Sequence, residues 1–222
     1  MLKVVRAQGQ GIVSDLGRWG YQHEGVPIGG VLDPFSFGLG NLALGNAVNS
    51  ACLELMGQFD FVCAKPCQVL FANRGAQALL NNKSVLCGQV LTLQEGDVLR
   101  TKPPHLGFWN MLCVQGGVDL PEIMDSRSTC LAAGFGGLQG RALQVGDELH
   151  FTQQFAPSIR TGVRLAMPLA RSGHFVPLVL HFLPGPEFFE LSENSQHLFT
   201  RQHFSLGTQS SRMGYRLEAS ES

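Results

Sequence analysis

The hydrophobic pattern of the chain consists mainly of short apolar runs separated by turn residues. Several runs alternate in part between apolar and polar positions, which is typical of strands with one buried face. Short strands that follow one another between turns are typical of a β sandwich or barrel, so we predict an all-β fold. The predicted strands cover residues 52–56, 59–62, 68–73, 78–80, 83–85, 89–93, 98–100 and 108–115.

Three turns between these runs have recognisable chemistry. Asn81 and Asn82 separate two of the runs and predict a tight hairpin, because asparagine tolerates a positive φ angle. Gly96-Asp97 and Gly146-Asp147 each precede a short apolar segment. We interpret both as turns in which glycine supplies backbone freedom and aspartate accepts a local hydrogen bond.

One helix is predicted at about residues 34–44. Asp33 is a suitable N-cap, Pro34 suits the first helical position, and Gly45 can end the helix. Two glycines inside this segment indicate close packing against another part of the chain. One face of the helix is apolar at helical spacing and is formed by Phe35, Leu39 and Leu42.

The strand pattern changes along the chain and predicts two domains. We expect an N-terminal β-rich domain at residues 1–151, a linker at 152–173 that is rich in Pro, Ser and Arg, and the start of a second β domain at 174–222. A strand is expected at residues 176–183. The second segment supplies too few strands to close a barrel. We therefore expect self-association, or packing on the first domain, to cover its edge.

Composition and charge exclude several classes of function. The chain is 44% hydrophobic and 15% charged, with a formal net charge of −1 and no run of Lys or Arg, so nucleic-acid binding is not expected. No apolar stretch is long enough for a membrane span, and the first residues contain no apolar signal core. We therefore expect a cytoplasmic protein whose six cysteines are free thiols, without a metal site on this chain.

The densest group of candidate functional residues is the segment 14–23. It places Asp15, Arg18, Tyr21 and His23 among glycines that allow the backbone to approach a ligand closely. Arginine offers a planar fork for a carboxylate or phosphate. The alternative is a rigid structural loop in which the aspartate and the arginine pair with each other.

A second group of candidates surrounds the predicted helix. Glycines lead into its N-terminus, which could bind an anion, although Asp33 occupies the cap and would oppose one. Asn41 and Asn46 flank the end of the helix, and Glu54 lies in the next strand. A buried acid needs a partner, and Arg18 is a candidate. The alternatives are a simple cap and a half-exposed strand.

Two further groups combine arginine with hydroxyl side chains. In the segment 125–129, Arg127 and Ser128 could bind a carboxylate or an oxyanion. Near the end of the sequence, Arg212 lies four residues before a second arginine and next to two serines. The alternatives are a polar turn for the first group and a solvated strand edge for the second. Neither group contains a nucleophile elbow or the order of a serine hydrolase triad.

These groups belong to a longer series of blocks that together resemble a known family. The blocks are Asp15-Leu16-Gly17-Arg18, Gly29-Gly30-Val31-Leu32-Asp33, Gly40-Asn41-Leu42, Gly45-Asn46, Leu53-Glu54, Gly116-Gly117-Val118-Asp119, Ser126-Arg127-Ser128-Thr129, Gly136-Gly137, Gly140-Arg141, Leu183-Pro184-Gly185-Pro186 and Ser211-Arg212-Met213-Gly214. In this order, over about residues 11–217, they resemble the biotin-dependent carboxyltransferase family, also called allophanate hydrolase subunit 2. This family includes the C subunit of bacterial 5-oxoprolinase, the KipA-like proteins and part of the urea carboxylase carboxyltransferase domain.

The resemblance implies a cyclophilin-like β architecture and an enzyme built from several subunits. The first function it implies is the C component of an ATP-dependent 5-oxoprolinase, which opens 5-oxo-L-proline to L-glutamate with a KipI-like B subunit and an A subunit. ATP would act through the complex. The second is a carboxyltransferase component that takes its carboxyl group from biotin on a partner, since this chain has no Met-Lys-Met attachment run. The third is a non-catalytic regulator that binds a KipI-like protein.

Within the first function, roles follow from side-chain chemistry. Arg18 and Arg127 are predicted to hold the substrate carboxylate, and Asp15, His23 or Glu54 to handle protons. Tyr21, Asp33, Asn41, Asn46, Ser128 and Arg212 complete the predicted substrate-binding set.

The sequence departs from the family pattern at two places. Family members usually have glycine where this chain has Asp125, and they usually continue well beyond the final block. We therefore expect the chain as given to lack 5-oxoprolinase activity, even with its partner subunits.

Overall fold

The computed structural model describes residues 1–73, 75–104, 109–152, 181–207, 209 and 214–219. Backbone contacts divide the chain into residues 1–169 and 170–222, and the two units are described separately. Nearly all of the predicted linker 152–173 and most of the predicted strand 176–183 lie outside the described residues. The candidate Arg212 also lies outside them.

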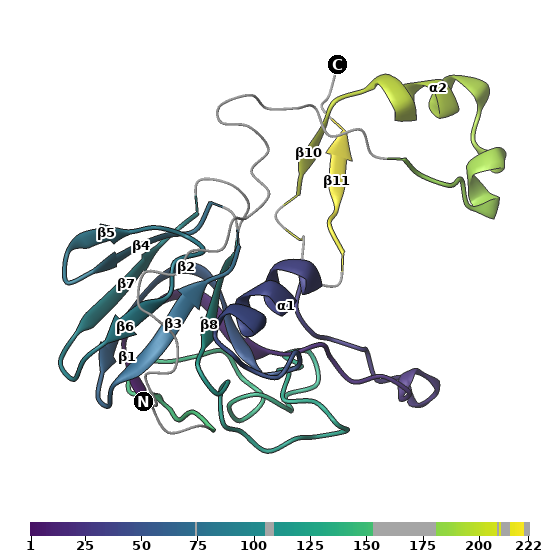
Figure 1. The fold of residues 1–222 in the computed structure, drawn as a ribbon. Coiled ribbons are helices and arrows are strands. Elements are labelled where there is room, and N and C mark those ends of the chain that lie inside the picture. Colours follow the sequence, from purple (N-terminus) through teal and green to yellow (C-terminus); the bar gives the residue numbers. More distant parts are fainter. Residues whose placement is uncertain (74, 105–108, 153–180, 208, 210–213, 220–222) are drawn as a thin grey trace. The chain divides into compact units, whose positions relative to one another are not determined.

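The first unit is a curled, mainly antiparallel β-sheet with one α-helix against it (Figure 1), which confirms the predicted fold class. Seven strands follow the order β5-β4-β7-β2-β8-β3-β6, while β1 pairs with β2 and β9. The strands are β1 (Leu2–Ser14), β2 (Cys52–Cys63), β3 (Cys67–Phe71), β4 (Gln77–Leu80), β5 (Lys83–Val85), β6 (Leu91–Leu93), β7 (Val98–Lys102), β8 (Asn110–Val114) and β9 (Glu148–Leu149).

The longest strands, β1 and β2, differ from the sequence-based expectation. The pattern did not predict β1, because three of its middle residues, Arg6, Gln8 and Gln10, are polar and the segment 6–10 is at least partly exposed. The two runs at 52–56 and 59–62 form a single strand, β2, which continues through Gly57. Gly57 pairs with Gly9 of β1, and both have positive φ angles. A Cβ atom on Gly9 would lie 2.0 Å from the Met56 carbonyl oxygen, so this pair brings the two backbones very close.

The hydrophobic core consists of two clusters on opposite faces of the sheet. In β3, Val69 and Phe71 belong to the larger cluster, while the intervening Leu70 belongs to the smaller one under the helix. In β8, Leu112 and Cys113 divide in the same way. Because side chains alternate across a strand, this division means that both faces of β3 and β8 are covered. It also explains why every residue in these two strands is buried.

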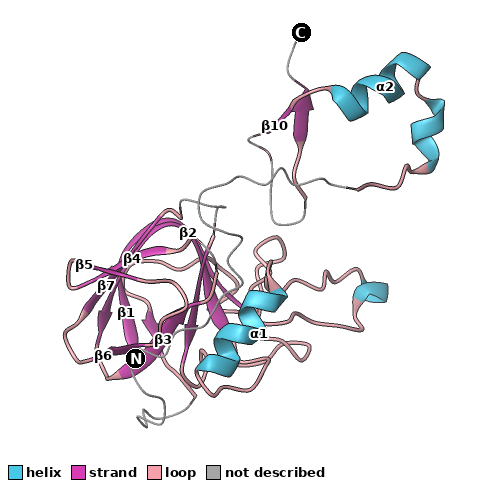
Figure 2. Cartoon of the chain, turned by 45° about the horizontal axis from the view of Figure 1, so that its top comes forward, coloured by secondary structure: helices cyan, strands magenta, loops and turns pink. Residues whose placement is uncertain are grey.

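Helix α1 (Pro34–Ala43) confirms the predicted helix, and Figure 2 shows it beside the sheet. The Asp33 side chain accepts a hydrogen bond from the Ser36 backbone N–H, as an N-cap does. At the other end, the Gly45 N–H donates to the Leu42 carbonyl and the Asn46 N–H to the Asn41 carbonyl. Gly45 has a φ angle of 67°, so the helix ends in a Schellman motif.

The apolar stripe of α1 identified in the sequence is not its buried face. Phe35 and Leu42 are 65% and 68% exposed. The face on the sheet is formed instead by Phe37, Gly40 and Asn41. A Cβ atom on Gly40 would lie 2.7 Å from both the Ala72 Cβ and the Cys113 Sγ. Glycine therefore sets the distance between helix and sheet at this position.

The three predicted turns have the expected geometry. Asn81 and Asn82 have φ angles of 50° and 67° and join β4 to β5 as a two-residue hairpin. Asp97 accepts a hydrogen bond from the Gln94 N–H at 2.7 Å, and Asp147 accepts one from the Gln144 N–H at 2.8 Å. Both aspartates thus stabilise a four-residue turn in the same way.

The second unit is small in the part that is described. It contains a short 3-10 helix η2 (Pro186–Glu190), helix α2 (Glu193–Arg201) and the antiparallel pair β10 (Phe204–Leu206) and β11 (Leu217–Ala219). The sequence pattern did not predict α2. The rings of Phe182, Phe188 and Phe199 pack together with centroid distances of 5.1–6.0 Å. Phe182 and Phe199 nevertheless remain 48% and 43% exposed.

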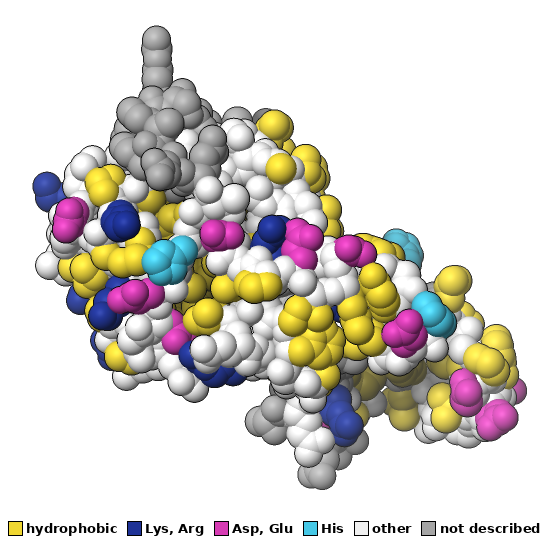
Figure 3. Space-filling model, turned by 90° about the horizontal axis from the view of Figure 1, so that it is seen from below, with side chains coloured by type: hydrophobic (Ala, Val, Ile, Leu, Met, Phe, Trp, Pro, Cys, Tyr) yellow, Lys and Arg dark blue, Asp and Glu magenta, His cyan; other side chains and the backbone are white. Residues whose placement is uncertain are grey.

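Charges of both signs are mixed on the face shown in Figure 3, where Lys and Arg do not gather into one patch. In the described residues, none of the helices has the length and apolar character of a membrane span. All six cysteines are free thiols. The Sγ atoms of Cys63 and Cys67 lie 3.9 Å apart, and burial raises the pKa of Cys67 to about 12.

Candidate functional site

The fully buried side chain of Asp15 connects the end of β1 with the loop 126–129. Its Oδ1 accepts hydrogen bonds from the hydroxyls of Ser126 and Ser128, at 2.7 and 2.6 Å, and from the Gly17 N–H at 2.8 Å. Its Oδ2 accepts one from the Arg127 N–H at 2.6 Å. Both carboxylate oxygens therefore have protein donors, and the Ser128 hydroxyl is part of the same network. This geometry favours positioning over proton transfer for Asp15, and scaffolding over substrate contact for Ser128.

Arg18 is also fully buried, but it is bound very differently. One of its Nη2 hydrogens is donated to the Ser128 carbonyl, and Nε lies 3.5 Å from the Ile123 carbonyl. Its Cζ lies 4.8 Å from the centre of the Phe135 ring, a cation–π contact. Nη1 is buried and has no hydrogen-bond partner in the described part of the chain. Within the described residues, no carboxylate lies at ion-pair distance from Arg18, so the expected pair with Asp15 or Glu54 is absent.

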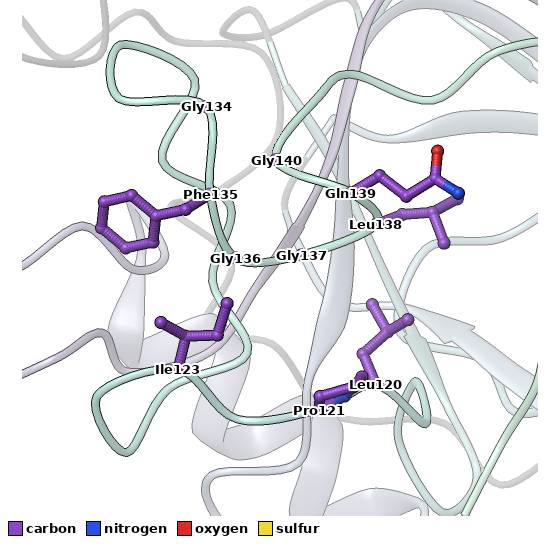
Figure 4. A pocket seen from close by; sticks show the side chains of 10 residues that line it. All are labelled: Leu120, Pro121, Ile123, Gly134, Phe135, Gly136, Gly137, Leu138, Gln139 and Gly140. Atoms are coloured by element: carbon purple, nitrogen blue, oxygen red, sulfur yellow. The ribbon is translucent and has the colours of Figure 1, made fainter.

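An open cavity of about 400 Å³ lies next to Arg18, between the loops 120–123 and 134–140 (Figure 4). In the figure, Ile123 and Phe135 lie on one side, Leu120 and Leu138 on the other, and the backbone of Gly136 and Gly137 between them. Ile123 and Phe135 are contacts of Arg18, so the guanidinium touches two residues of this lining. The cavity is lined by Leu120, Pro121, Ile123, Gly134, Phe135, Gly136, Gly137, Leu138, Gln139 and Gly140.

Gln139 provides a polar side chain in this lining. It has a φ angle of 58°, in the left-handed region that residues other than glycine adopt infrequently. Its amide oxygen accepts hydrogen bonds from Nε and Nη2 of Arg141, at 3.3 and 3.1 Å. Arg141 in turn makes two 2.8 Å hydrogen bonds to the carboxylate of Asp147. The pKa of Asp147 is lowered, first by its hydrogen bonds from Arg141, which keeps the carboxylate ionised and the pair intact.

Arg127, the second predicted carboxylate-binding arginine, already has partners within the protein. Its Nη1 lies 2.6 Å from the carboxylate of Glu122, and its Nε donates to the Leu120 carbonyl at 2.9 Å. The side chain therefore supports the wall of the cavity through Leu120. In this arrangement its charge is compensated by Glu122, in contrast to the charge of Arg18.

Three further candidates are Glu54 and His23, predicted for proton transfer, and Tyr21, predicted for substrate binding. Glu54 is buried in β2 and accepts a hydrogen bond from the Leu32 N–H at 3.0 Å. His23 lies in the short 3-10 helix η1 (Gln22–Glu24), where its side chain is 73% exposed. The Tyr21 hydroxyl donates to the carboxylate of Asp125 at 3.0 Å, and this hydrogen bond raises the pKa of the phenol. The His23 and Tyr21 side chains thus contact acids other than Asp15.

The asparagines at the end of α1 hold backbone segments together. Asn41 donates to the carbonyls of Val48 and Ser50, and its Oδ1 accepts from Asn46. Asn46 also donates to the Val114 carbonyl and accepts from the Gly116 N–H, both at 2.7 Å. Asp33 caps α1 and accepts hydrogen bonds from both the backbone and the hydroxyl of Ser36. Asp33 thus has the geometry of a helix cap, which was the structural alternative for that residue.

Sequence reasoning thus identified Arg18 but missed the cavity beside it. Four glycines within residues 134–140 were the available signal, and part of that segment occurs among the family blocks. What could not be seen was that the segment 134–140 meets Leu120, because the two come from separate loops. The predicted site roles themselves stay predictions.

Comparison with known proteins gives a consistent set of relatives. Residues 24–222 match the family described as carboxyltransferase domain, subdomain A and B. The chain is 36% identical over 220 residues to the C subunit of 5-oxoprolinase from Escherichia coli and 29% identical over 221 residues to that from Haemophilus influenzae. It covers 68% of the length of each, and the match covers 98% of this chain. The crystal structure of Kluyveromyces lactis urea carboxylase superposes with a TM-score of 0.78 at 26% identity, over 98% of this chain and 20% of the larger one.

Proposed function

Because the chain belongs to the carboxyltransferase domain family, subdomains A and B, we propose that it is the C subunit of an ATP-dependent 5-oxoprolinase. The reaction is hydrolysis of the lactam bond of 5-oxo-L-proline to give L-glutamate, driven by ATP. The single observation that carries the proposal is the 36% identity to the C subunit of a 5-oxoprolinase over nearly the whole chain. Since that relative is named as a subunit of its enzyme, we assign the activity to the assembled complex and not to this chain alone.

The chemistry around Arg18 supports this substrate. 5-Oxo-L-proline is a small ring with a carboxylate, and Arg18 is a buried cation whose Nη1 has no partner. The cavity beside it has an apolar lining that suits the ring. Asp15, Ser128 and Arg127 hold the loops that form this wall. In this proposal ATP is bound by the complex, and the chain itself holds no metal.

A KipI-like B subunit and an A subunit are the proposed partners, in the cytoplasm. The exposed apolar face of α1 fits such a contact. Phe35 and Leu42 are the exposed large side chains of this face, and Trp19 and Val48, in loops outside the helix, are also 65% and 59% exposed. No charged side chain occurs between residues 34 and 53. These side chains expose on the order of 500 Å², a substantial part of the roughly 800 Å² that each partner contributes to a standard interface. We assign this face to the B subunit.

A second function is favoured by the fold itself. The superposition with a urea carboxylase at a TM-score of 0.78 supports a carboxyltransferase component that receives its carboxyl group from biotin on a partner. The third function, a KipA-like regulator, would need only the partner surface and not the cavity.

A chimera tests the proposal and separates these functions. This chain would replace the matching residues in the C subunit of Escherichia coli 5-oxoprolinase, and the chimera would be combined with the other subunits of that enzyme. We expect ATP hydrolysis and glutamate formation that depend on 5-oxo-L-proline, whereas the chain alone stays inactive. Turnover of urea with a biotinylated partner would support the second function. Assembly without turnover of either substrate would contradict an enzymatic role and support the regulator.

A further inference from the structure

We propose that Cys63 and Cys67 form a reversible disulfide when the protein meets a peroxide, and that this bond fixes the end of the sheet at which both residues lie. The inference concerns a modification site and does not depend on the proposed function. It rests on the contact between the two sulfur atoms, on the backbone hydrogen bonds that hold both residues at one turn, and on the small depth of the pair below the surface.

The two thiols already contact each other in the reduced protein. Their Sγ atoms lie 3.9 Å apart, which allows a weak hydrogen bond between them. A disulfide has an S–S length of about 2.05 Å, so the two sulfur atoms need to approach each other by roughly 2 Å. Rotations of both side chains about their Cα–Cβ bonds can supply this movement. The bond therefore does not require the two backbones to move together.

The backbone attaches both cysteines to the turn between β6 and β7. Cys63 is the last residue of β2, where its N–H donates to the Asp97 carbonyl and its own carbonyl accepts from the Gly96 N–H, both at 2.8 Å. Cys67 is the first residue of β3 and pairs with Leu93, the last residue of β6. Because the same turn holds both residues, their side chains stay close together in the folded state.

The pair is buried, but only a short surface loop covers it. Between the two cysteines, Lys65 is exposed, while Ala64 and Pro66 are half-buried. The Lys65 carbonyl lies 3.1 Å from the Cys63 Sγ and also accepts a hydrogen bond of 3.1 Å from the Met1 amino group. A shift of this three-residue loop is enough to admit a molecule as small as hydrogen peroxide. Larger oxidants need more of the fold to open.

Cys63 is the residue that reacts first. Burial raises the pKa of both thiols, that of Cys67 to about 12. The hydrogen bond between them lowers the pKa of Cys63 and raises that of Cys67, so the Cys63 thiolate forms more readily. Because the thiolate is the nucleophile and both pKa values are raised, the reaction is slow near neutral pH. The bond therefore responds to sustained exposure to peroxide and not to a brief pulse.

The reaction balances with one peroxide for each pair of thiols. The Cys63 thiolate attacks one oxygen of hydrogen peroxide, the O–O bond breaks, and the released hydroxide takes up the thiol proton as water. The sulfur of Cys67 then attacks the sulfenic acid on Cys63, the S–O bond breaks, and the Cys67 proton leaves with that hydroxyl as a second water. Both sulfur atoms are oxidised and the peroxide is reduced. A reducing thiol reverses the change by disulfide exchange.

The bond would join two strands that are not neighbours in the sheet. Strand β8 lies between β2 and β3 in the sheet order, and it pairs with β2 only at residues 53–55. Cys63 lies at the far end of β2, beyond that pairing. A disulfide between Cys63 and Cys67 would therefore link β2 directly to β3 at this end. The closed loop is short, so we expect a modest rise of the melting temperature, about 5 °C.

Mass spectrometry after peroxide treatment tests whether the bond forms. The purified chain would be reduced, freed of reductant, exposed to excess hydrogen peroxide for a long period, and unfolded in the presence of iodoacetamide. We expect two fewer alkylated thiols than the six of the reduced chain, and a peptide spanning residues 63–67 that has lost two hydrogen atoms. Dithiothreitol should restore both thiols. Six alkylated thiols, a sulfinic acid at either position, or a bond to another cysteine would overturn the proposal.

Three variants assign the bond and its effect. Cys63→Ala and Cys67→Ala each remove one partner, so neither variant should form the disulfide or gain stability on oxidation. Cys52→Ala, at a buried cysteine of the smaller core cluster, is the matched control and should form the bond as the parent chain does. Circular dichroism would confirm that each variant is folded.

Thermal unfolding of the oxidised and reduced forms tests what the bond does. The parent chain and Cys52→Ala should each melt about 5 °C higher after oxidation and return to the lower value with dithiothreitol. An oxidised parent that melts at the same or a lower temperature would contradict the stabilising role of the bond. A rise of the same size in Cys63→Ala would show that peroxide acts elsewhere and would overturn the assignment to this pair.

Discussion

Two buried charged centres lie three residues apart in the loop after β1, and they are satisfied to very different degrees. Asp15 receives four hydrogen bonds from the protein, and these bonds join the loop after β1 to the loop 126–129. Arg18 has an Nη1 without any partner and lacks a counter-ion among the described residues. A buried charge that is fully hydrogen-bonded stabilises a fold, whereas one left incomplete destabilises it and has a better explanation in ligand binding. The comparison therefore indicates that Asp15 holds the fold together and that Arg18 is available for a ligand.

The strongest test of the comparison is Asp15→Ala. The substitution leaves the hydroxyls of Ser126 and Ser128 and two backbone N–H groups without their acceptor. We expect the free energy of unfolding to fall by about 3–5 kcal/mol, because buried donors lose a charged partner. Urea denaturation followed by circular dichroism measures it. As a control, Asp33→Ala removes only the cap of α1 and should cost about 1 kcal/mol. Equal losses for the two variants would show that Asp15 is no more structural than a cap.

Two glycines of α1 differ in a similar way, because one is tightly packed and the other faces open space. Gly40→Ala would place a Cβ 2.7 Å from Ala72 and Cys113, so we expect a loss of about 1–3 kcal/mol. Gly38→Ala has nothing within 4 Å and improves helix propensity, so it should stabilise by about 1 kcal/mol. Thermal unfolding of the two variants should therefore shift in opposite directions. A shift of the same sign in both would mean that α1 does not pack on β8 through Gly40.

Arg18→Lys tests the other side of the comparison. Lysine keeps the charge but loses the planar fork and the stacking on Phe135. Since Arg18 has no ion pair to lose, we expect the free energy of unfolding to change by only about 1 kcal/mol or less. Turnover by the chimeric complex should fall steeply, which coupled ATP hydrolysis would measure. A variant that unfolds would instead place Arg18 with Asp15 among the structural residues.

The smallest expected effect concerns Tyr21 and Asp125. The hydrogen bond to the Asp125 carboxylate raises the pKa of the Tyr21 phenol above its ordinary value. This contact is fully present below the ordinary pKa of tyrosine and is lost as the pH rises through the raised pKa of the folded state, because the phenolate is repelled by the carboxylate. Asp125→Gly should return the pKa toward its ordinary value, which ultraviolet titration would detect. The φ angle of 57° at Asp125 is one that glycine adopts readily, so the fold should tolerate the change.

Several parts of the fold could be predicted because they depend on neighbouring residues alone. The hairpin at Asn81-Asn82 and the turns at Asp97 and Asp147 follow from backbone freedom and one local hydrogen bond. The cap and the end of α1 follow from the short-range chemistry of Asp33 and Gly45. The mainly β class followed from the alternation of short runs. None of these features needs information from a distant part of the chain.

Other features required the tertiary structure. The polar middle of β1 lacks an apolar pattern, and its strand is defined by pairing with β2 about 50 residues away. The buried face of α1 is not its most apolar one, because Gly40 fits the sheet more closely than a large side chain could. Arg18 was recognisable as a candidate from its neighbours. Only the fold shows that Asp15 is saturated while Arg18 is not, since their partners lie about 105–113 residues away in sequence. The order of amino acids determines which groups are present, and long-range packing decides which of them are left with unfilled bonding capacity.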